Sequence, residues 1–282
     1  MRNLILAFAL CLGMSGWSVA DVYYVEEVVN PGSGSKKQGR RKTVNKVYIK
    51  GRQQKVESSI ETDKETVKAL KKQGQALNSS VILRLDKKDV YEIDLDKYVF
   101  SQEKIPPPAK VAAKPAAKKN KTDGPEKTFS VKETKEEAVI AGIKCRKVLA
   151  KMVVNYRDPK TKKPLKQNRY LYTAWIAKDF PGYKELQAFQ KMHEQQTSYP
   201  ALVSSNIEQL KNTVEDSESL TTELDALKGF VMRSSLKATV KSGKKKETTV
   251  FQLDREIKEL LHLALADSVF RVSEDFTKID KE

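Results

Sequence analysis

Histidine and cysteine are the side chains of this sequence best suited to metal binding and nucleophilic catalysis, and the chain has two of each. His193 begins the run His-Glu-Gln-Gln-Thr, which resembles the start of a zinc-protease helix, but Thr197 occupies the position of the second metal ligand. His262 lies among leucines and is expected to pack against them. Cys145 has apolar neighbours and is expected to be buried in a strand. These residues predict neither a metal site nor a catalytic site.

Other catalytic patterns are missing from the sequence as well. No serine has the spacing of a nucleophile elbow, and no glycine-rich loop is placed to hold a phosphate group. Carboxylates are numerous, but no spacing singles out an acid–base pair. We therefore expect a protein that is not an enzyme and that needs no cofactor. The abundant lysines and arginines remain to be explained.

Positive charge is concentrated in a few segments of a chain whose formal net charge is +16. Residues 36–55 contain nine Lys/Arg and no acidic residue, and residues 144–169 contain ten against Asp158 alone. Two interpretations remain open: solvated faces and lysine-guarded edges of a sheet, or a surface for a polyanion or an anionic membrane. Few aromatic residues are interleaved with these cations, which counts against nucleic acid. The predicted basic surface comprises Lys46, Lys50, Arg52, Lys144, Arg146 and Arg169.

Residues 1–20 have the features of a secretory signal peptide. Arg2 precedes a short apolar run, and Ser-Val-Ala at 18–20 provides small residues for cleavage after Ala20. The run is too short to span a bilayer, which requires about 20 apolar residues. We expect a periplasmic or secreted protein without a transmembrane segment, in which Cys145 is the only cysteine and stability comes from a core rather than a disulfide.

The clearest structural pattern runs from Ser80 to Ser101. Apolar and polar residues alternate on both sides of a turn, which predicts an antiparallel hairpin with one apolar and one acidic face. Such a sheet needs a cover, either helices or a ligand. Trp175 lies mid-strand with parity opposite to Tyr172, so it either faces a ligand or packs under a helix. The predicted ligand-binding residues are Val81, Leu83, Leu85, Tyr91, Ile93, Leu95 and Trp175.

The rest of the chain supplies further strands and a few helices. Strand patterns occur in residues 22–60 and resume from 129, a helix is expected at 63–77, and helical stripes fill 183–228. Residues 104–128, rich in Pro, Lys and Ala, predict a disordered linker that serves as a spacer, a polyanion tether or a tolerated insertion. We expect residues 21–103 and 129–282 to build one domain.

The predicted fold class is α+β and β-rich. A curved antiparallel sheet would form an unclosed half-barrel, and the helices of 183–228 would pack on or in its concave face. The length of the chain allows a substantial hydrophobic core.

Several short phrases, in their order along the chain, resemble an uncharacterised family of secreted bacterial proteins. They are Val-Tyr-Ile-Lys-Gly at 47–51, Leu-Arg-Leu-Asp-Lys-Lys at 83–88, Ile-Ala-Gly-Ile-Lys-Cys at 140–145, Ala-Trp-Ile-Ala-Lys-Asp at 174–179 and Asp-Ser-Val-Phe at 267–270. That family resembles the lipoprotein-carrier (LolA/LolB-like) superfamily, which implies an unclosed barrel whose helices enclose an apolar cavity for acyl chains. The helix at 63–77 and the basic linker depart from this pattern. The resemblance implies no catalytic residues.

These observations lead to one functional expectation and two alternatives. We expect an exported binding module for an apolar or acyl-bearing ligand, such as a lipid or a lipoprotein acyl chain, with lysines at the rim attracting an anionic headgroup. The first alternative is a structural or protein-interaction module of the cell envelope whose cavity is filled by its own helices. The second is a polyanion-binding protein.

Overall fold

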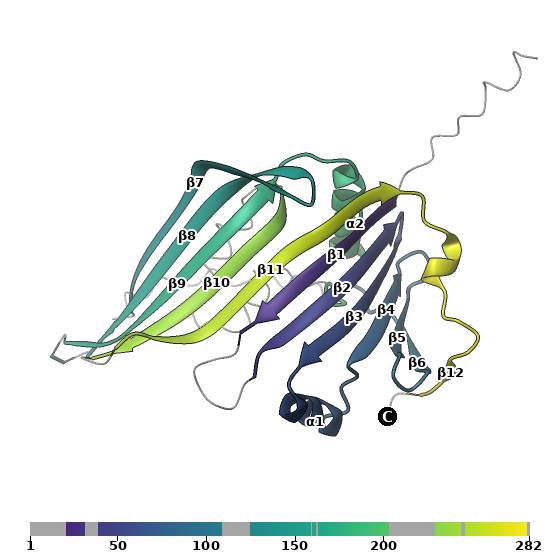
Figure 1. The fold of residues 1–282 in the computed structure, drawn as a ribbon, viewed down its shortest axis with the longest axis horizontal. Helices are drawn as coiled ribbons and strands as arrows, with labels where there is room; N and C mark the ends of the chain where they lie inside the picture. The colour runs from purple at the N-terminus through teal and green to yellow at the C-terminus, as the bar shows by residue number, and fades with distance from the viewer. Residues whose placement is uncertain are drawn as a thin grey trace, which may run out of the picture.

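The fold was obtained as a computed structural model, which describes residues 21–31, 39–108, 125–158, 160–161, 163–202, 229–243 and 246–280 (Figure 1). The strands of the first half are β1 (Asp21–Asn30), β2 (Arg41–Lys50), β3 (Gln53–Thr62), β4 (Asn78–Arg84), β5 (Asp89–Asp94) and β6 (Val99–Lys104). Those of the second half are β7 (Glu126–Ile140), β8 (Ile143–Arg157), β9 (Pro164–Ala177), β10 (Phe230–Ser242), β11 (Thr248–Leu263) and β12 (Thr277–Lys278). The helices are α1 (Lys64–Lys72), α2 (Tyr183–Gln196) and the short 3₁₀ helix η1 (Asp267–Phe270).

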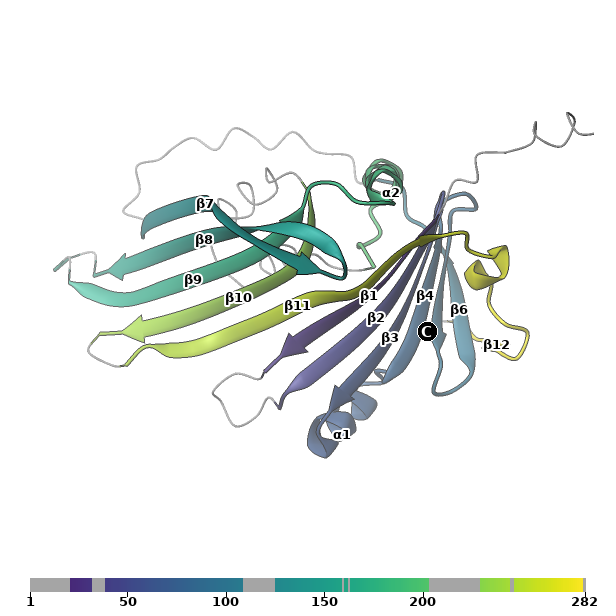
Figure 2. The ribbon, with the colours of Figure 1, turned by 45° about the horizontal axis from the view of Figure 1, so that its top comes forward.

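Within the described residues, the twelve strands form one continuous sheet in the order β12-β6-β5-β4-β3-β2-β1-β11-β10-β9-β8-β7. All neighbours pair antiparallel except β12, which runs parallel to β6. β1 and β11 meet at the centre, and the sheet curves without closing (Figure 2). The predicted β-rich, unclosed antiparallel sheet is therefore confirmed.

Strands from both sides of the predicted linker belong to this sheet. Ordered structure also extends into that segment at both ends, because β6 continues through Lys104 and β7 begins at Glu126. Ile105 is buried in the core and its N–H donates a hydrogen bond to the carbonyl of Lys88 at 2.9 Å. The boundaries predicted for the linker were thus wrong. Residues 109–124 lie outside the described residues.

α1 confirms the predicted helix near residue 63. Asp63 is its N-cap, and the carboxylate accepts hydrogen bonds from the backbone N–H groups of Glu65 and Thr66. These bonds satisfy backbone donors that have no partner within the first turn of the helix. The helix ends at Lys72, earlier than predicted, and buries only Leu70.

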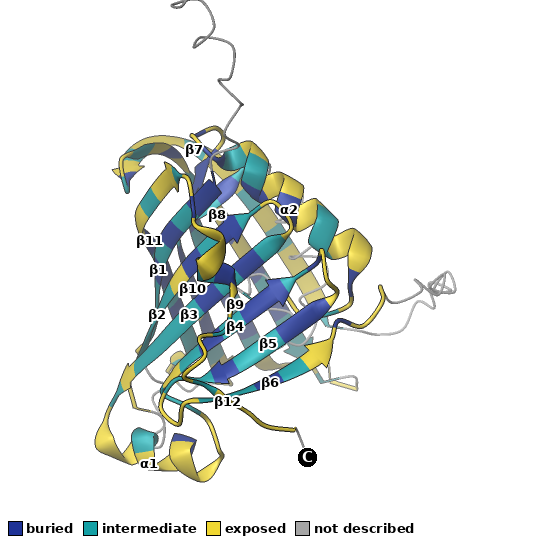
Figure 3. Ribbon diagram, turned by 90° about the vertical axis from the view of Figure 1, so that its right-hand side faces the viewer, coloured by how far each residue is buried: buried dark blue, intermediate teal, exposed yellow. Residues whose placement is uncertain are grey.

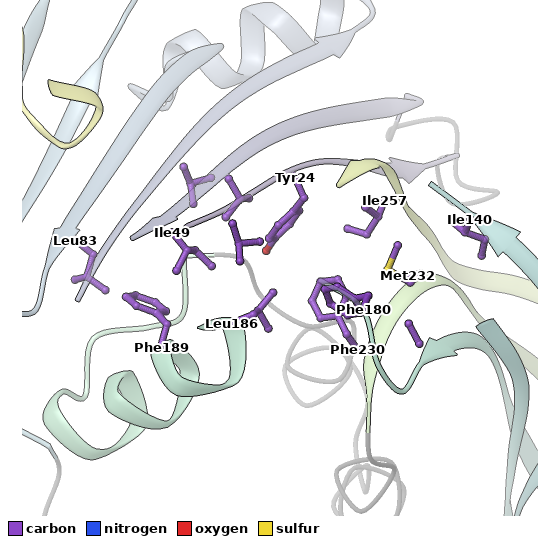
Figure 4. Close-up of a cluster of buried hydrophobic side chains, with 14 of the residues drawn as sticks. Tyr24, Ile49, Leu83, Ile140, Phe180, Leu186, Phe189, Phe230, Met232 and Ile257 are labelled. Atoms are coloured by element: carbon purple, nitrogen blue, oxygen red, sulfur yellow. The ribbon is translucent and has the colours of Figure 1, made fainter. Parts of the chain in front are cut away.

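We call the face of the sheet that carries Val22 and Tyr24 the inner face. α2 lies against this face at β1 and β2 (Figure 3). Leu186 and Phe189 of the helix are buried, Tyr183 and Met192 are partly buried against the core, and most of its other residues are exposed. The main core joins the helix to the inner face (Figure 4) and consists of Val22, Tyr24, Val47, Ile49, Val56, Leu83, Leu85, Val90, Ile105, Ile140, Cys145, Ala177, Phe180, Leu186, Phe189, Phe230, Met232 and Ile257. A helix therefore covers the sheet, as predicted. The helical stripes predicted within 203–228 lie outside the described residues.

We call the opposite side of the sheet the outer face, and the C-terminal segment covers part of it. Phe270 of η1 is 1% exposed and packs with Ile82, Ile93 and Leu265. Lys50 holds this segment, since its Nζ lies 2.8 Å from a carboxylate oxygen of Asp267. Both faces of the β4–β5 region are therefore apolar and covered.

A buried ion pair lies on the inner face at the centre of the sheet. Arg255 of β11 donates through Nε to the carboxylate of Glu26 on β1, and both side chains are buried. The second oxygen of Glu26 accepts from Asn45 at 3.1 Å, and Arg255 also donates to the carbonyl of Val231 at 3.3 Å. Burial lowers the pKa of the Arg255 guanidinium from its ordinary value. Buried charges persist only when paired in this way.

Candidate ligand-binding site

The register of β4 and β5 decides which predicted ligand-binding residues share a face. Ile82 lies opposite Tyr91 and Leu83 lies opposite Val90, and directly paired residues point to the same side of a sheet. Tyr91, Ile93 and Leu95 therefore project to the outer face, where they join the cluster under the C-terminal segment. The prediction that this hairpin has a single apolar face is wrong, because the turn between the strands shifts their relative parity by one residue.

The remaining predicted residues of β4 and its turn lie on the inner face. Leu83 and Leu85 are buried in the main core, and Val81 packs against it. Leu83 lies beside Phe189 of α2 (Figure 4). Glu92, predicted to be on a wetted face, also points inward, where its carboxylate accepts a hydrogen bond from the Tyr199 hydroxyl at 3.0 Å. Val81, Leu83 and Leu85 thus belong to or contact the main core, and Trp175 packs against this core as well. Tyr91, Ile93 and Leu95 belong to the cluster on the outer face instead.

An open pocket lies where this inner apolar surface reaches the end of α2. It has a volume of about 440 Å³, within the range of small-molecule sites. We call it the rim pocket, and its lining residues are Arg52, Leu85, Lys88, Ile105, Pro107, Pro108 and Gln196. Two of these, Arg52 and Leu85, belong to the residues predicted from the sequence.

Three turns or strand ends are hydrogen-bonded together to form the rim pocket. The N–H of Leu85 donates to the carbonyl of Arg52 at 3.0 Å, and Ile105 donates to Lys88 at 2.9 Å. The guanidinium of Arg52 donates through Nη2 to Gln196 Oε1 at 2.8 Å, which links the β2–β3 turn to the C-terminal end of α2. Ser198, just after α2, donates to the carbonyl of Pro106 at 3.4 Å. The walls are therefore held in place before any ligand arrives.

The rim pocket combines an apolar wall with positive charge. Leu85 is 2% exposed and Ile105 is 9% exposed, so their inner surfaces belong to the core. Arg52 and Lys88 line the pocket, and no carboxylate belongs to the lining. Such a site attracts an anionic group through charge-assisted hydrogen bonds while an apolar chain contacts the leucine, isoleucine and prolines.

Trp175 does not contribute to the rim pocket. Tyr172 and Ile176 are buried, whereas Trp175 has the opposite parity on β9 and lies opposite Arg233 on the neighbouring strand. Its indole ring is partly exposed in a different recess, and the Nζ of Lys147 lies 5.7 Å from the ring centroid. Burial raises the pKa of Tyr172 to about 12.

The predicted basic surface is divided among separate places and is largely paired. Lys144 lies 2.7 Å from Glu137, Arg146 lies 3.6 Å from Glu133, and Arg169 lies 3.3 Å from Glu247. Lys50 is bound to Asp267 on the outer face. Within the described part of the chain, Lys46 and Arg52 have no carboxylate partner. The structure therefore does not gather these six cations into one surface.

The two histidines and Cys145 lie apart from the rim pocket. Cys145 is buried as predicted, and burial raises the pKa of its thiol. His193 is half-buried on α2 beside Phe189, and burial lowers its pKa. His262 is an exposed residue, and its Nε2 lies 3.8 Å from a carboxylate oxygen of Glu185. Among the residues that the structure describes, no group of three metal-binding side chains occurs.

Sequence reasoning missed most of the rim pocket. Lys88 looked like an ordinary turn residue, and Ile105 looked like the start of a linker. The one available signal was an isolated isoleucine between a strand and three prolines, which is an unusual place for an exposed apolar side chain. Gln196 could be placed only through the packing of α2.

Comparisons with known proteins add no further assignment. No known family matches the chain, and no curated protein is similar to it. The resemblance to the lipoprotein carriers therefore stays a prediction. No helix of the described residues is long and apolar enough to cross a bilayer.

Proposed function

We propose that this protein is an exported, non-enzymatic binding module for an anionic amphiphile, such as a fatty acid or an acyl-bearing lipid, which it holds at the rim pocket. The carboxylate or phosphate would contact Arg52 and Lys88, and the acyl chain would lie on Leu85, Ile105 and the prolines. The protein would act in the periplasm or outside the cell, since the first 20 residues resemble a signal peptide.

The observation that carries this proposal is the composition of the rim pocket. Apolar side chains continuous with the main core meet two cations there, and no carboxylate lines the pocket. Burying apolar surface contributes about 25 cal/mol per Å² removed from water, and the cations favour a negatively charged head over a neutral one. The curved sheet with a helix on its inner face is also the arrangement that the resemblance to the lipoprotein carriers implies.

A second candidate function has an observation of its own. Tyr24, Phe180, Leu186, Phe189 and Phe230 fill the space between α2 and the inner face, and each is at most 8% exposed. A module with a filled interior would serve as a structural or protein-interaction unit of the envelope. The two candidates differ in whether the rim pocket takes a ligand.

Thermal unfolding with dodecanoate and with dodecanol separates these candidates. The two probes have the same chain and differ in the charge of the head. We expect dodecanoate to raise the melting temperature of the protein by mass action, and dodecanol to raise it less. Arg52→Glu should remove most of the dodecanoate effect because it reverses a charge in the pocket.

Lys46→Glu is the matched control, since Lys46 is exposed on the sheet and lies outside the rim pocket. It changes net charge by the same amount and should leave the dodecanoate effect intact. An equal loss in both variants would reduce the effect to general electrostatics. No effect of dodecanoate on the folded wild-type protein would favour the filled module.

A further inference from the structure

A second recess lies on the outer face, across the four neighbouring strands β1, β11, β10 and β9. Its volume is about 480 Å³. We call it the outer recess, and it is lined by Glu27, Val29, Thr173, Trp175, Arg233, Ser234, Ser235, Asp254, Arg255, Glu256 and Lys258. Because the strand register places Glu27, Arg233 and Glu256 opposite one another, these residues form one continuous surface.

Trp175 provides the apolar part of the outer recess. The ring is partly exposed, although its strand neighbours Ala174 and Ile176 point inward and are buried. The ammonium of Lys147, which is not part of the lining, lies 5.7 Å from the ring centroid and holds the indole from the side of β8. A large flat ring therefore borders a cavity whose other side chains are polar apart from Val29.

The charges of the outer recess are balanced and paired with one another. Arg233 donates to Glu256 at 2.9 Å, and the ammonium of Lys258 lies 2.9 Å from Glu256 and 3.9 Å from Glu27. The hydroxyl of Ser235 donates to Asp254 at 2.6 Å. The guanidinium of Arg255 points to the inner face, where it pairs with Glu26, so it adds no charge to the recess. Lys42, just outside the lining, lies 3.0 Å from Glu27, so the three carboxylates Glu27, Asp254 and Glu256 stand against the three cations Arg233, Lys258 and Lys42. An anion would meet the carboxylates and a cation would meet the arginine and the lysines, so neither is favoured.

We propose that the outer recess binds a neutral sugar. One face of a pyranose ring carries C–H groups and would pack on the indole of Trp175. Its hydroxyls would accept hydrogen bonds from Arg233 and donate them to Glu256 and Asp254, whose positions are fixed by the pairs already described. Groups held in place before binding lose little conformational freedom when the ligand arrives, which favours affinity.

Isothermal titration of the full chain with cellotriose, maltotriose and the trimer of N-acetylglucosamine tests this proposal. We expect at least one of these neutral sugars to bind with a dissociation constant of about 1 mM or tighter. Trp175→Ala should weaken binding at least about tenfold, and Glu256→Gln should weaken it while keeping the shape of the recess. Added salt should leave the affinity unchanged, because a neutral ligand has no charge to screen.

Leu171→Ala is the matched control, because Leu171 lies on the same strand with the same parity, is 43% exposed and is not part of the recess. It should bind the sugar like the wild type. Failure of all three sugars to bind, or equal weakening by Leu171→Ala, would overturn the proposal. The proposal would also be overturned if a charged oligo-glucuronate, and none of the neutral sugars, bound to the wild type and lost affinity in Trp175→Ala. None of these outcomes bears on the rim pocket, whose ligands and variants are different.

Discussion

Substitution of Arg255 tests how much the buried Arg255–Glu26 ion pair contributes to the stability of the sheet. Arg255 is 7% exposed and Glu26 only 1% exposed, so Arg255→Met leaves a buried carboxylate that still accepts a hydrogen bond from Asn45 at 3.1 Å but has lost its cation. Breaking a buried pair on one side costs about 3–5 kcal/mol. In a protein of this size, each kcal/mol lowers the melting temperature by roughly 2–4 °C, so we expect a fall of about 6–20 °C.

Denaturant unfolding at neutral pH would measure this loss, with Arg233→Met as the matched control. Arg233 makes a similar contact with Glu256, but its side chain is 43% exposed, and such pairs contribute at most about 1 kcal/mol. The double variant Arg255→Met with Glu26→Leu should recover most of the stability, because no buried charge is left unpaired. Equal losses for Arg255→Met and Arg233→Met, or a double variant less stable than Arg255→Met alone, would refute this reasoning.

Three further predictions concern other parts of the fold. Burial raises the pKa of Tyr24 to about 12, so its contribution to stability is complete below the unfolded value of about 10 and is lost as pH rises toward 12. The free energy of unfolding should fall by roughly 3 kcal/mol over this range. Unfolding free energies measured from pH 8 upward should therefore fall less steeply in Tyr24→Phe. The hydrogen bond and charge of Lys50 lower the pKa of Asp267. The contribution of this pair to stability is therefore complete above about pH 3.9, and it is lost as pH falls through the pKa of the folded state. The rate of amide exchange in η1 should rise over that pH range, and Asp267→Asn should raise this rate already at neutral pH. Replacing residues 109–124 with a short Gly/Ser loop should leave the melting temperature unchanged, since each doubling of loop length costs only about 0.6 kcal/mol, whereas a deletion that also removes Ile105 should lower it.

Strand periodicity in the sequence was enough to predict the sheet, but not the faces of its strands. The alternation in β4 and β5 is real, and both strands form where the pattern indicates. Their relative facing depends on the number of residues in the turn between them, and an error of one residue moves Tyr91 and Ile93 to the opposite side. For the same reason, parity separated Trp175 from Tyr172 but could not say which of the two is buried.

The rim pocket could be predicted only in part for a different reason. Leu85 was selected as an apolar strand residue and Arg52 as a member of a basic segment, and no pattern of residues places the two together. They meet because the β2–β3 turn is hydrogen-bonded to the β4–β5 turn and to the end of α2. Contacts between turns depend on three-dimensional packing, and a periodic pattern carries no information about them. Ile105 could not be assigned to the pocket for the same reason, since a single apolar residue beside prolines forms no periodic pattern.

Contacts between a bound fatty acid and individual methyl groups test the central claim most directly. The measurement is a set of intermolecular nuclear Overhauser effects between the acyl protons of dodecanoate and isotope-labelled methyl groups of the protein. We predict contacts to Leu85 and Ile105 in the rim pocket, and none to Ile93, which lies on the outer face under the C-terminal segment. Contacts to Ile93 without contacts to Leu85 and Ile105, or no contacts to any of the three at saturating dodecanoate, would contradict the account.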